Sequence, residues 1–560
     1  MAGPRPLIQT PAARLDWSRP SAPVATDFND IYFSADGGLE ETRTVFLGGC
    51  GLPDKWAGRP VFTIAELGFG SGLNFLAAWK AWMQTAGPRQ RLHYLSIEKF
   101  PFDKKQLTQA LRAWPELDAL SARLLENWPG RVKGIHRLNF GPVTLTLIHD
   151  DVSEALNQVD GLKADAWFLD GFNPSENTEM WSAEVMQGVA DGCAPGARLA
   201  TFSVAGAVRS ALSGAGFTVR KMPGFGRKRH RLEADFPGEA KALTPPIDKA
   251  LIVGAGIAGR SLARALSARH ISFDMIDAGL HPAASGNPAA LVKPRFDLQD
   301  RPESRFFLSA YLHALRAYPE TAVISRGVRQ IPKTEKEAER YKKLAAQAPL
   351  GDDRLRWEND SLWIDEALVI DPSKLFDAFE PRRETYETIR RHAEFSHVFI
   401  AAGYGIRALA PDLGFRFSRG QLSWAEPVWD RPTAYGGYAV NLDGAALVGA
   451  THDRLDDRDP FELRPEDDRK NLSALAEIVG RETSPVDRQS RASVRVTSRD
   501  TLPVICDLGQ GHWTISGLGS RGFTFAPLLA EALVAKICNE LGPLDKRLRL
   551  KFSDPNRLSL

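Results

Sequence analysis

The residues most suited to chemistry in this 560-residue chain include a glycine-rich turn in its second half. An apolar run, Ala250–Val253, leads into Gly254-x-Gly256-x-x-Gly259, and Ser261–Arg269 follows with the apolar spacing of a helix. A second short run, Ile271–Ile276, ends on Asp277. Glycines at this spacing let the backbone approach a pyrophosphate, and a carboxylate at the second strand tip suits ribose hydroxyls. The stretch predicts a dinucleotide site, with NAD and FAD both open.

A second turn lies in the first half of the chain and has different glycine spacing. The β-rich run Val61–Leu67 enters Gly68-Phe69-Gly70-Ser71-Gly72, and Leu73–Trp82 reads as the following helix. Glu66 comes directly before the first glycine. This arrangement favours S-adenosylmethionine over a dinucleotide, because no pyrophosphate needs a cradle and glycine lets the backbone approach the methionine part.

Acids follow the next predicted strands of the first half. The runs Leu92–Ile97, Val143–Ile148 and Ala166–Leu169 read as strands. Ligands in open α/β sheets bind beyond the carboxyl ends of the strands. Each acid alone is better explained as a helix cap or a solvated turn, whereas acids at successive strand ends indicate one site. Strand-end carboxylates can accept hydrogen bonds from ribose hydroxyls or face an adenine amino group. The predicted set is Glu66, Glu98, Asp150 or Asp151, and Asp170.

Composition limits the class of protein. The chain is long enough for two to four domains, and 43% hydrophobic with 25% charged residues is ordinary for a globular protein. We find no apolar run long enough to cross a membrane and no secretory signal. Four cysteines without a CxxC pair argue against a disulfide framework or a zinc ribbon and favour a reducing compartment, the cytoplasm. We expect no metal, no membrane contact and a monomer.

Three segments organise the chain around the two turns. Pro237–Asp248 carries three prolines and reads as a linker, so we expect domains at 1–236 and 249–560. Asp27–Leu47 mixes aromatic and acidic residues, and a packed surface segment and a pocket cover are both open. Further elements of the first half are a helix at Thr178–Val189 and a final strand at Phe217–Lys221.

The first half resembles the methyltransferase half of the MnmC family, bifunctional enzymes that modify the wobble uridine of certain tRNAs. The resemblance rests on the segments DFNDIYFS, GLEETRTVFL, AELGFGSGLNFLAAW, SIEKFPF, WFLDGFNP and GFGRKRHRL. It implies a class I (Rossmann-like) methyltransferase sheet. The basic tail at Gly224–Leu232 is then a candidate contact for tRNA phosphates, although a solvated charged hairpin explains it as well. Phe69, Phe172 and Trp181 are candidates for stacking on an anticodon base, or for the core.

The second half resembles the D-amino-acid-oxidase and glycine-oxidase family of FAD proteins over nearly all of Lys249–Leu560. The resemblance rests on the first fingerprint, on a strand ending in an Ala-Gly pair, and on a terminal glycine motif before an apolar helix. It implies FAD rather than NAD, in a Rossmann domain with an inserted α+β substrate domain. Arg495 lies where this family places a carboxylate-binding arginine; a surface ion pair is the alternative. The further candidate cofactor residues are Ser285, Asn287, Gly403, Gly519, Arg521 and Gly522, with Lys293 or Arg295 supplying positive charge.

The joined resemblances imply an α/β protein with two consecutive activities on one tRNA base. The FAD domain would remove the carboxymethyl group of 5-carboxymethylaminomethyl-(2-thio)uridine, with Arg495 on the carboxylate. The first domain would methylate the resulting amine with S-adenosylmethionine, with Asp170 orienting the amine and accepting its proton. Three alternatives stay open: an amine oxidase fused to a methyltransferase for a free metabolite, a non-catalytic tRNA-binding scaffold, and a family member with one inactive half.

Overall fold

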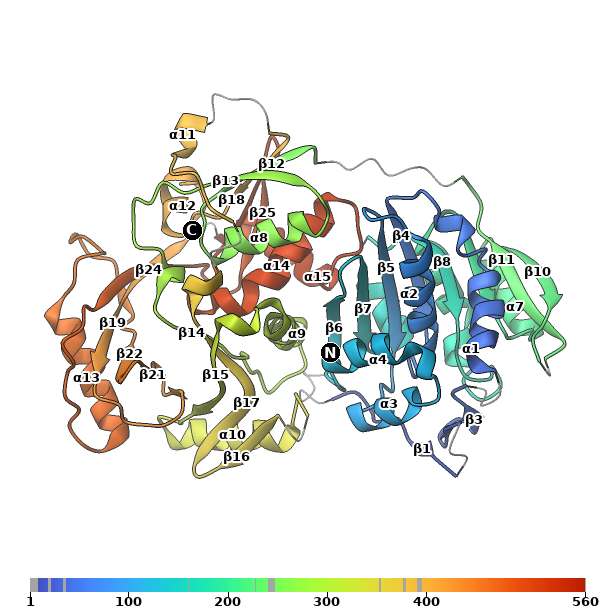
Figure 1. Ribbon diagram of the computed structural model, residues 1–560, viewed down its shortest axis with the longest axis horizontal. Helices are drawn as coiled ribbons and strands as arrows, with labels where there is room; N and C mark the ends of the chain where they lie inside the picture. The colour runs from blue at the N-terminus through green and yellow to red at the C-terminus, as the bar shows by residue number, and fades with distance from the viewer. Residues whose placement is uncertain are drawn as a thin grey trace. The chain divides into compact units, whose positions relative to one another are not determined.

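The computed structural model describes residues 9–18, 22–33, 37–159, 161–226, 228–239, 247–351, 354–375, 379–389 and 395–558. The chain divides into two compact units, each treated by itself below (Figure 1). The first unit consists of Gln9–Pro245 together with Cys538–Lys546. The second consists of Pro246–Ile537 and Arg547–Leu560, apart from the undescribed N-terminal residues. None of the helices in the described ranges is long and apolar enough to cross a membrane.

An eight-stranded sheet forms the centre of the first unit, in the order β10-β11-β9-β8-β4-β5-β7-β6. The five central strands run parallel, whereas β6 at one edge and β11 next to β9 are antiparallel to their neighbours. The carboxyl ends of the parallel strands therefore share one edge. The strands are β4 (Val61–Leu67), β5 (Arg91–Glu98), β6 (Gly134–Asn139), β7 (Val143–His149), β8 (Ala164–Leu169), β9 (Cys193–Thr201), β10 (Thr218–Pro223) and β11 (His230–Asp235).

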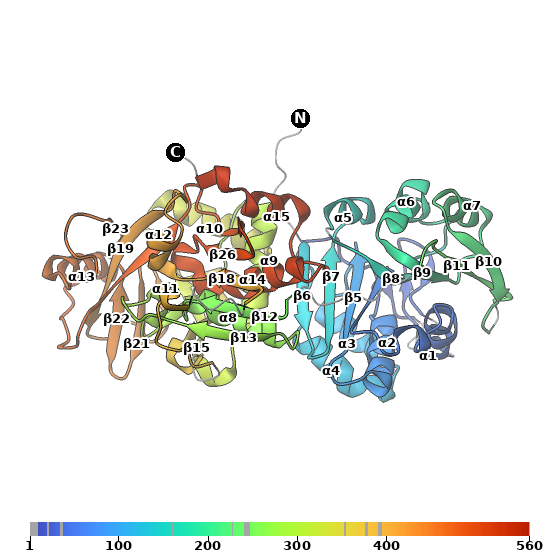
Figure 2. The ribbon, with the colours of Figure 1, turned by 90° about the horizontal axis from the view of Figure 1, so that it is seen from above.

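Helices cover both faces of this sheet, as the view along the layers shows (Figure 2). Apolar residues of β4, β5 and β8 pack on both sides, because alternate side chains of a strand point to opposite faces. On one face lie α1 (Gly38–Glu41), α2 (Leu73–Thr85), α3 (Lys104–Leu111) and α4 (Asp118–Glu126). On the other lie α5 (Val152–Gln158), α6 (Ala183–Asp191) and α7 (Gly206–Gly214).

Short elements complete the first unit. A π-helical segment, η1 (Thr42–Gly48), continues α1, and the 3-10 turns are η2 (Asp54–Trp56), η3 (Pro115–Leu117) and η4 (Glu179–Trp181). A three-stranded sheet joins β1 (Leu15–Asp16), β2 (Val24–Ala25) and β3 (Asp30–Ile31).

Two expected elements of the first unit are wrong in detail. The single helix predicted at Thr178–Val189 is divided into η4 and α6, because the Ser182 hydroxyl accepts from the Val185 N–H and caps a new helix. The strand at Phe217–Lys221 is present as β10 but is not the last, since β11 follows and inserts between β10 and β9. The end of the basic tail is therefore part of the sheet.

The second unit contains a five-stranded sheet in the order β13-β12-β18-β26-β25. Its first four strands are parallel, which is the arrangement of a Rossmann domain, and β25 pairs antiparallel with β26. The helices α8 and α14 pack against one another beside it. These elements are β12 (Lys249–Val253), α8 (Ile257–Ser267), β13 (Ser272–Ile276), β18 (His397–Ile400), β25 (Val504–Gly509), β26 (His512–Ser516) and α14 (Gly522–Ile537).

A ten-stranded, mainly antiparallel sheet fills the intervening segments of the second unit, which matches the predicted inserted α+β region. Its strands are β14 (Ala290–Val292), β15 (Val323–Gln330), β16 (Leu355–Glu358), β17 (Ser361–Ile370), β19 (Arg416–Ala425), β20 (Thr433–Ala434), β21 (Tyr438–Leu442), β22 (Ala445–Gly449), β23 (Asp453–Arg454) and β24 (Arg491–Thr497). The accompanying helices are α9 (Pro302–Ala317), α10 (Glu335–Gln347), α11 (Tyr386–Ile389), α12 (Ile406–Leu409), α13 (Pro465–Val479) and α15 (Lys546–Ser553).

The segment Cys538–Lys546 follows α14 but belongs to the first unit. The Glu540 carboxylate pairs with the Arg91 guanidinium, and both side chains are mostly buried. The Arg137 guanidinium donates to the Leu541 carbonyl, and the Leu541 side chain joins the apolar core of the sheet. The first unit is thus assembled from two separate parts of the sequence.

Candidate active sites

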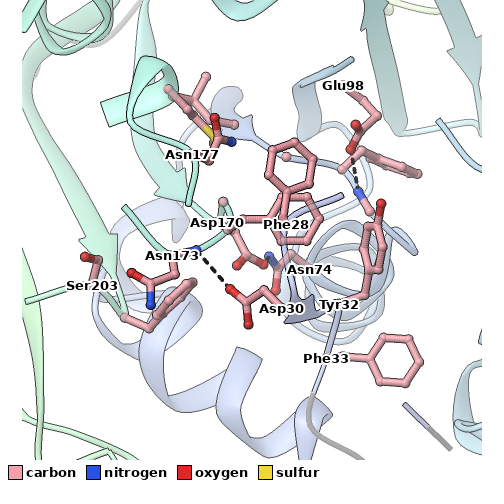
Figure 3. A pocket seen from close by; sticks show the side chains of 18 of the residues that line it. Phe28, Asp30, Tyr32, Phe33, Asn74, Glu98, Asp170, Asn173, Asn177 and Ser203 are labelled. Atoms are coloured by element: carbon pink, nitrogen blue, oxygen red, sulfur yellow. Dashed lines mark hydrogen bonds between the residues drawn. The ribbon is translucent and has the colours of Figure 1, made fainter. Parts of the chain in front are cut away.

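A cavity of about 600 Å³ opens in the first unit at the shared edge where β4, β5, β7 and β8 end (Figure 3). Backbone from the glycine turn forms part of its wall, and carboxyl and aromatic side chains form the rest. Of the turn and strand-end residues singled out in the sequence, Gly68, Phe69, Gly70, Ser71, Glu98, Asp150, Asp151, Asp170 and Phe172 line the cavity, whereas Gly72 does not.

Glu66 does not line this cavity, contrary to its expected place beside the ligand. Its side chain is fully buried in β4, where Oε1 accepts from Asn74 Nδ2 at 2.9 Å and Oε2 accepts from the Ser96 hydroxyl at 2.7 Å. Burial, followed by the nearby Asp170 charge, raises the pKa of Glu66 well above its usual value. Glu66 therefore supports the site from beneath it.

Glu98 connects the tip of β5 to the glycine turn. Its Oε2 accepts from the Gly70 N–H at 2.9 Å (Figure 3), and its Oε1 accepts from the Phe100 N–H at 2.7 Å. Burial raises the pKa of this carboxyl, and the backbone N–H bonds oppose that rise. Each carboxylate oxygen has a second acceptor position, so Glu98 can also accept from a ribose hydroxyl.

The two acids after β7 have different surroundings. Asp151 caps α5 by accepting from the Ser153 N–H, and it pairs with Lys99 at 2.9 Å. These bonds lower its pKa against the opposing effect of burial. Asp150 is nearly buried, accepts from the Asp151 N–H and lies 3.4 Å from the Lys133 ammonium. Asp151 is thus engaged as a helix cap, which leaves Asp150 as the better candidate to face an adenine.

Asp170 lies at the tip of β8, in the cavity wall. Its Oδ2 accepts a 2.7 Å bond from Asn74 Nδ2, and the two side chains face each other in Figure 3. Burial raises the pKa of Asp170 to about 7, although the Asn74 bond and the Lys228 charge lower it. A carboxyl that is half ionised near neutral pH is suited to accept a proton from an amine.

The segment after β2 covers part of the cavity, which resolves the two interpretations of Asp27–Leu47 in favour of a pocket cover. Phe28, Asp30 and Tyr32 all line the cavity. The Phe28 ring stacks on Phe172 with centroids 4.5 Å apart, and the Asp30 carboxylate accepts from the Asn173 N–H at 2.9 Å (Figure 3). The aromatic and acidic residues of this segment follow no periodicity from which their positions could be predicted.

The candidate stacking aromatics differ in position. Phe69 and Phe172 line the cavity, whereas Trp181 is buried and donates from its indole N–H to the Phe172 carbonyl. Trp181 therefore supports the turn that carries Phe172.

The basic tail is partly neutralised by neighbouring acids. Lys228 pairs with Glu41 at 2.9 Å at the cavity edge, Arg231 pairs with Glu233 at 2.7 Å, and Arg220 pairs with Asp235. Arg227 lies outside the described residues. A phosphate contact would therefore compete with existing ion pairs at these three positions.

In the second unit, the glycine fingerprint is packed against neighbouring backbone. A Cβ on Gly254 would lie 2.5 Å from the Ala401 carbonyl oxygen, and one on Gly259 would lie 1.9 Å from the Gly254 carbonyl oxygen. Asp277 accepts from the Ala255 N–H and the Gly279 N–H, each at 2.8 Å. The turn thus has the close backbone approach and the braced second-strand acid that a dinucleotide cradle requires.

Ser285 and Asn287 reach the same region by different routes. The Ser285 hydroxyl accepts from the Ile257 N–H at 3.0 Å, at the first turn of α8 and next to Gly256. Asn287 Oδ1 accepts from Arg491 at 2.6 Å. The structure brings Ser285 to the helix N-terminus where phosphates bind, and it places Asn287 against the start of β24.

The terminal glycine motif begins α14 and has cations near it. Gly519 has a left-handed backbone, with φ of +57°, and a Cβ on Gly522 would lie 3.2 Å from the Ile257 side chain at the start of α8. Burial and the nearby Arg295 lower the pKa of Arg521 to about 10. Burial, Arg521 and Arg340 lower the pKa of Lys293 to about 8. Such a donor set suits an electron-rich ring edge, so these residues fit FAD.

Two other predicted residues of the second unit are Gly403, beyond the end of β18, and Arg495, within β24. Gly403 follows β18 with φ of +52° and open space around the position of a Cβ. Arg495 lies on β24, donates to the Thr451 carbonyl at 3.1 Å and forms no ion pair with a carboxylate of the described residues. Burial lowers its pKa, although the guanidinium stays charged at neutral pH. A half-buried cation with unused donors is suited to bind a carboxylate, and a surface ion pair does not explain it.

Comparison with known proteins finds a family for each half of the chain. A family model described as S-adenosyl-L-methionine-dependent methyltransferase matches residues 115–237, and one described as FAD dependent oxidoreductase matches 249–379 and 372–536. The tRNA 5-methylaminomethyl-2-thiouridine biosynthesis bifunctional protein MnmC of Maricaulis maris is 42% identical over 552 residues, 94% of this chain and 92% of its own. The corresponding proteins of Caulobacter sp. strain K31 and Caulobacter vibrioides are each 40% identical, with 98% and 97% of both chains covered. The cofactor predictions, S-adenosylmethionine and FAD, are confirmed.

Proposed function

Because this chain belongs to the MnmC family of bifunctional tRNA-modification enzymes, we propose that its two units act in sequence on one wobble uridine of tRNA. The second unit converts 5-carboxymethylaminomethyl-(2-thio)uridine to the 5-aminomethyl form. The first unit then methylates the new amine. The cavity at the glycine turn of the first unit and the braced glycine fingerprint of the second, together with the two matching family models, support this proposal.

The oxidative step takes place on the carbon between the amine and the carboxylate. FAD, when bound, supplies the acceptor for the hydride that leaves this carbon. The substrate nitrogen loses one proton, and water adds to the resulting C=N bond to release glyoxylate and the primary amine. Arg495 holds the carboxylate through its guanidinium fork and so presents the carbon in a fixed orientation. Lys293 is a buried cation in the same unit, and burial lowers its pKa. Its charge favours negative charge nearby.

Methyl transfer requires an unprotonated amine in line with the methyl group. The cavity offers Gly68 and Gly70 for backbone approach, with Glu98 and Asp150 as acceptors for the methyl donor. Asp170 orients the amine and accepts the proton that it must lose. Phe28 and Phe172, already stacked on one another, form an apolar wall on which a pyrimidine can rest. We expect a monomer in the cytoplasm, where its tRNA substrates are.

Nucleoside mass analysis tests the whole proposal. Carboxymethylaminomethyl-containing tRNA is incubated with the purified, FAD-loaded protein, with and without S-adenosylmethionine. We expect the aminomethyl nucleoside without it and the methylaminomethyl nucleoside with it. If the free modified nucleoside reacted as fast as the tRNA, the small-molecule alternative would replace this proposal. Salt dependence of tRNA binding gives a second check, because phosphate contacts weaken as salt rises.

A further inference from the structure

The carboxamide of Asn74 lies between two carboxyl groups in the first unit. Its Nδ2 donates to Asp170 Oδ2 at 2.7 Å and to Glu66 Oε1 at 2.9 Å. Its Oδ1 accepts from the Thr42 hydroxyl at 2.8 Å. Asn74 lines the cavity beside Asp170, and Figure 3 shows its side chain directed at the Asp170 carboxylate. Both hydrogens of the amide and its oxygen are therefore used.

These bonds leave the carboxamide one orientation. Turning it over would place its oxygen against the ionised Asp170 oxygen, so the 2.7 Å donor bond to Asp170 would become a repulsive contact. Glu66 is fixed in turn, because Ser96 donates to its other oxygen. Asp170 is thus connected through Asn74 to groups that cannot move independently.

The groups that hold Asn74 come from rigid, buried elements. Glu66 lies in β4 and Ser96 in β5, the neighbouring strand, and both are fully buried. Asn74 is the second residue of α2, and Thr42 begins η1; both are buried. A reacting group whose supports are locked by packing keeps its geometry, whereas one on a mobile support does not.

We propose that Asn74 is a positioning residue for methyl transfer, which fixes the Asp170 carboxylate in the cavity wall and keeps Asp170 the ionised member of the Asp170–Glu66 pair. This inference rests on the proposed methylation of an aminomethyl group and names the residue that tunes its proton acceptor. Asn74 acts through Asp170 and touches no reacting atom.

Charge around the pair explains why one negative charge is held at Asp170. Glu66 is fully buried beside the Asp170 charge, and both effects raise its pKa well above the usual value, whereas the donors Ser96 and Asn74 only oppose that rise, so Glu66 keeps its proton. Asp170 faces the Lys228 ammonium, which favours its ionised form, and the Glu41 and Asp30 carboxylates, which oppose it. The Asn74 bond stabilises the ionised form further, since a donor lowers the pKa of the carboxyl that accepts from it.

The transfer itself balances with these groups. The amine, which has lost its extra proton to solvent, attacks the methyl carbon with its lone pair, and a C–N bond forms. The C–S bond breaks, and its electron pair stays on sulfur. The product is a secondary ammonium, and one of its N–H protons passes to the Asp170 carboxylate. An Asp170 that was already protonated could not take this proton, so the reaction depends on the state that Asn74 maintains.

The test is the pH profile of methyl transfer to aminomethyl-tRNA by the full-length, FAD-loaded protein. In the unchanged protein we expect kcat to rise with pH through a midpoint near the Asp170 pKa of about 7. Asn74→Leu keeps the volume but removes the donor, so the midpoint should move up by about one unit, which alone lowers kcat at pH 7 about fivefold. Loss of the fixed Asp170 position should bring the total fall to about 10- to 100-fold. The KM for S-adenosylmethionine should stay within about threefold, since methyl-donor contacts are retained.

Thr42→Val gives a graded second variant, because it leaves the Asn74 amide in place but frees it to turn. We expect the midpoint to move in the same direction by about half as much. Asn139→Leu, at an exposed position of β6, is the matched control and should leave the profile unchanged. A retained KM for S-adenosylmethionine confirms that the first unit of each variant is folded, and retained flavin absorbance confirms the same for the second unit.

The outcomes separate this inference from the proposed function. If the unchanged protein failed to methylate aminomethyl-tRNA, the proposed function would fall and this inference with it. If it methylated normally and neither Asn74→Leu nor Thr42→Val moved the midpoint, only the role of Asn74 would be wrong. A loss of S-adenosylmethionine binding in Asn74→Leu would leave Thr42→Val to decide, and an unmoved midpoint there overturns the proposal.

Discussion

The two glycine turns of this protein are built on one plan and differ in a way that identifies their ligands. In both, a buried strand leads through glycines into a helix, and an acid at the tip of the next strand accepts N–H bonds from the turn, Glu98 from Gly70 and Asp277 from Ala255. The acid therefore holds the loop in shape in addition to any contact with a ribose.

The backbone of the two turns diverges after this common bracing. Gly68, Gly70 and Gly72 all have left-handed φ values, +87°, +51° and +75°, so the first chain segment curls before α2 begins. Among the three glycines of the second turn, only Gly254 has a left-handed φ, +104°. Gly259 is already part of the helix α8 and packs on Gly254. The second arrangement brings a helix N-terminus to the ligand, which suits a pyrophosphate, whereas a curled loop suits S-adenosylmethionine, which has none.

The largest expected effects come from adding one methyl group to each turn. A Cβ on Gly68 would lie 2.0 Å from the Asp170 carbonyl oxygen, and one on Gly254 would lie 2.5 Å from that of Ala401. Gly68→Ala should lower methylation about 100-fold or more and leave a yellow protein that still oxidises its substrate. Gly254→Ala should lower the oxidation by a similar factor and leave methylation intact. Gly206→Ala, with open space around it, is the control. Loss of both activities in either variant would contradict the independence of the two sites.

Removing the reacting or binding side chain should separate the two activities while both cofactors stay bound. Asp170→Ala should lower kcat for methylation by about 10²- to 10⁴-fold, the usual contribution of a general base, with S-adenosylmethionine binding largely intact. Arg495→Ala should cost the oxidative step about 10- to 100-fold, mainly in KM, since charge-assisted bonds to the carboxylate are lost. Nucleoside analysis with each separate tRNA substrate measures both. Near-normal methylation by Asp170→Ala would remove Asp170 from the mechanism.

Glu98 and Asp277 are the acids that brace the two turns, and replacing either should have a smaller effect, of similar size at the two sites. Glu98→Gln and Asp277→Asn keep shape but have only one acceptor oxygen, so each gives up one of its two backbone N–H bonds. We expect about tenfold weaker binding of S-adenosylmethionine in the first variant and of FAD in the second. Calorimetry and flavin fluorescence measure the two constants. An effect of Glu98→Gln on FAD, or of Asp277→Asn on S-adenosylmethionine, would break the comparison.

The smallest effect concerns stability. The fold raises the Asp170 pKa from 3.8 to about 7, so the folded protein binds a proton more tightly than the unfolded chain and loses stability as pH rises between these values. Asp170→Asn removes the ionised form, and it should raise the melting temperature by a few degrees, about 2–4 °C, at pH 8 but not at pH 4. Thermal unfolding at both pH values measures this. A lower melting temperature at pH 8 would mean that the Asp170 charge stabilises the fold.

The strands, turns and strand-end acids could be predicted from sequence because each leaves a local pattern, an apolar run bounded by glycine or acid. β11 could not, because its residues, His230–Asp235, are mostly charged and only its neighbours make it a strand. The sequence predicts Glu66 beside the ligand, because a sequence gives the order of residues along a strand but not how deep each side chain lies below a cavity. Asn74 left no signal, since a buried asparagine at the start of a helix is read as part of the turn. The pairing of Asn74 with Asp170 joins residues far apart in the chain.

The return of Cys538–Lys546 to the first unit changes what a break in the linker would mean. The predicted linker is Pro237–Asp248, and its residues 240–246 lie outside the described ranges. A chain severed there keeps Glu540 and Leu541 on the C-terminal fragment, although their partners Arg91 and Arg137 are on the other. The two pieces would remain one noncovalent particle, in the manner of a protein reconstituted from complementary fragments. An N-terminal half expressed without the C-terminal half would expose the surface that Cys538–Lys546 covers.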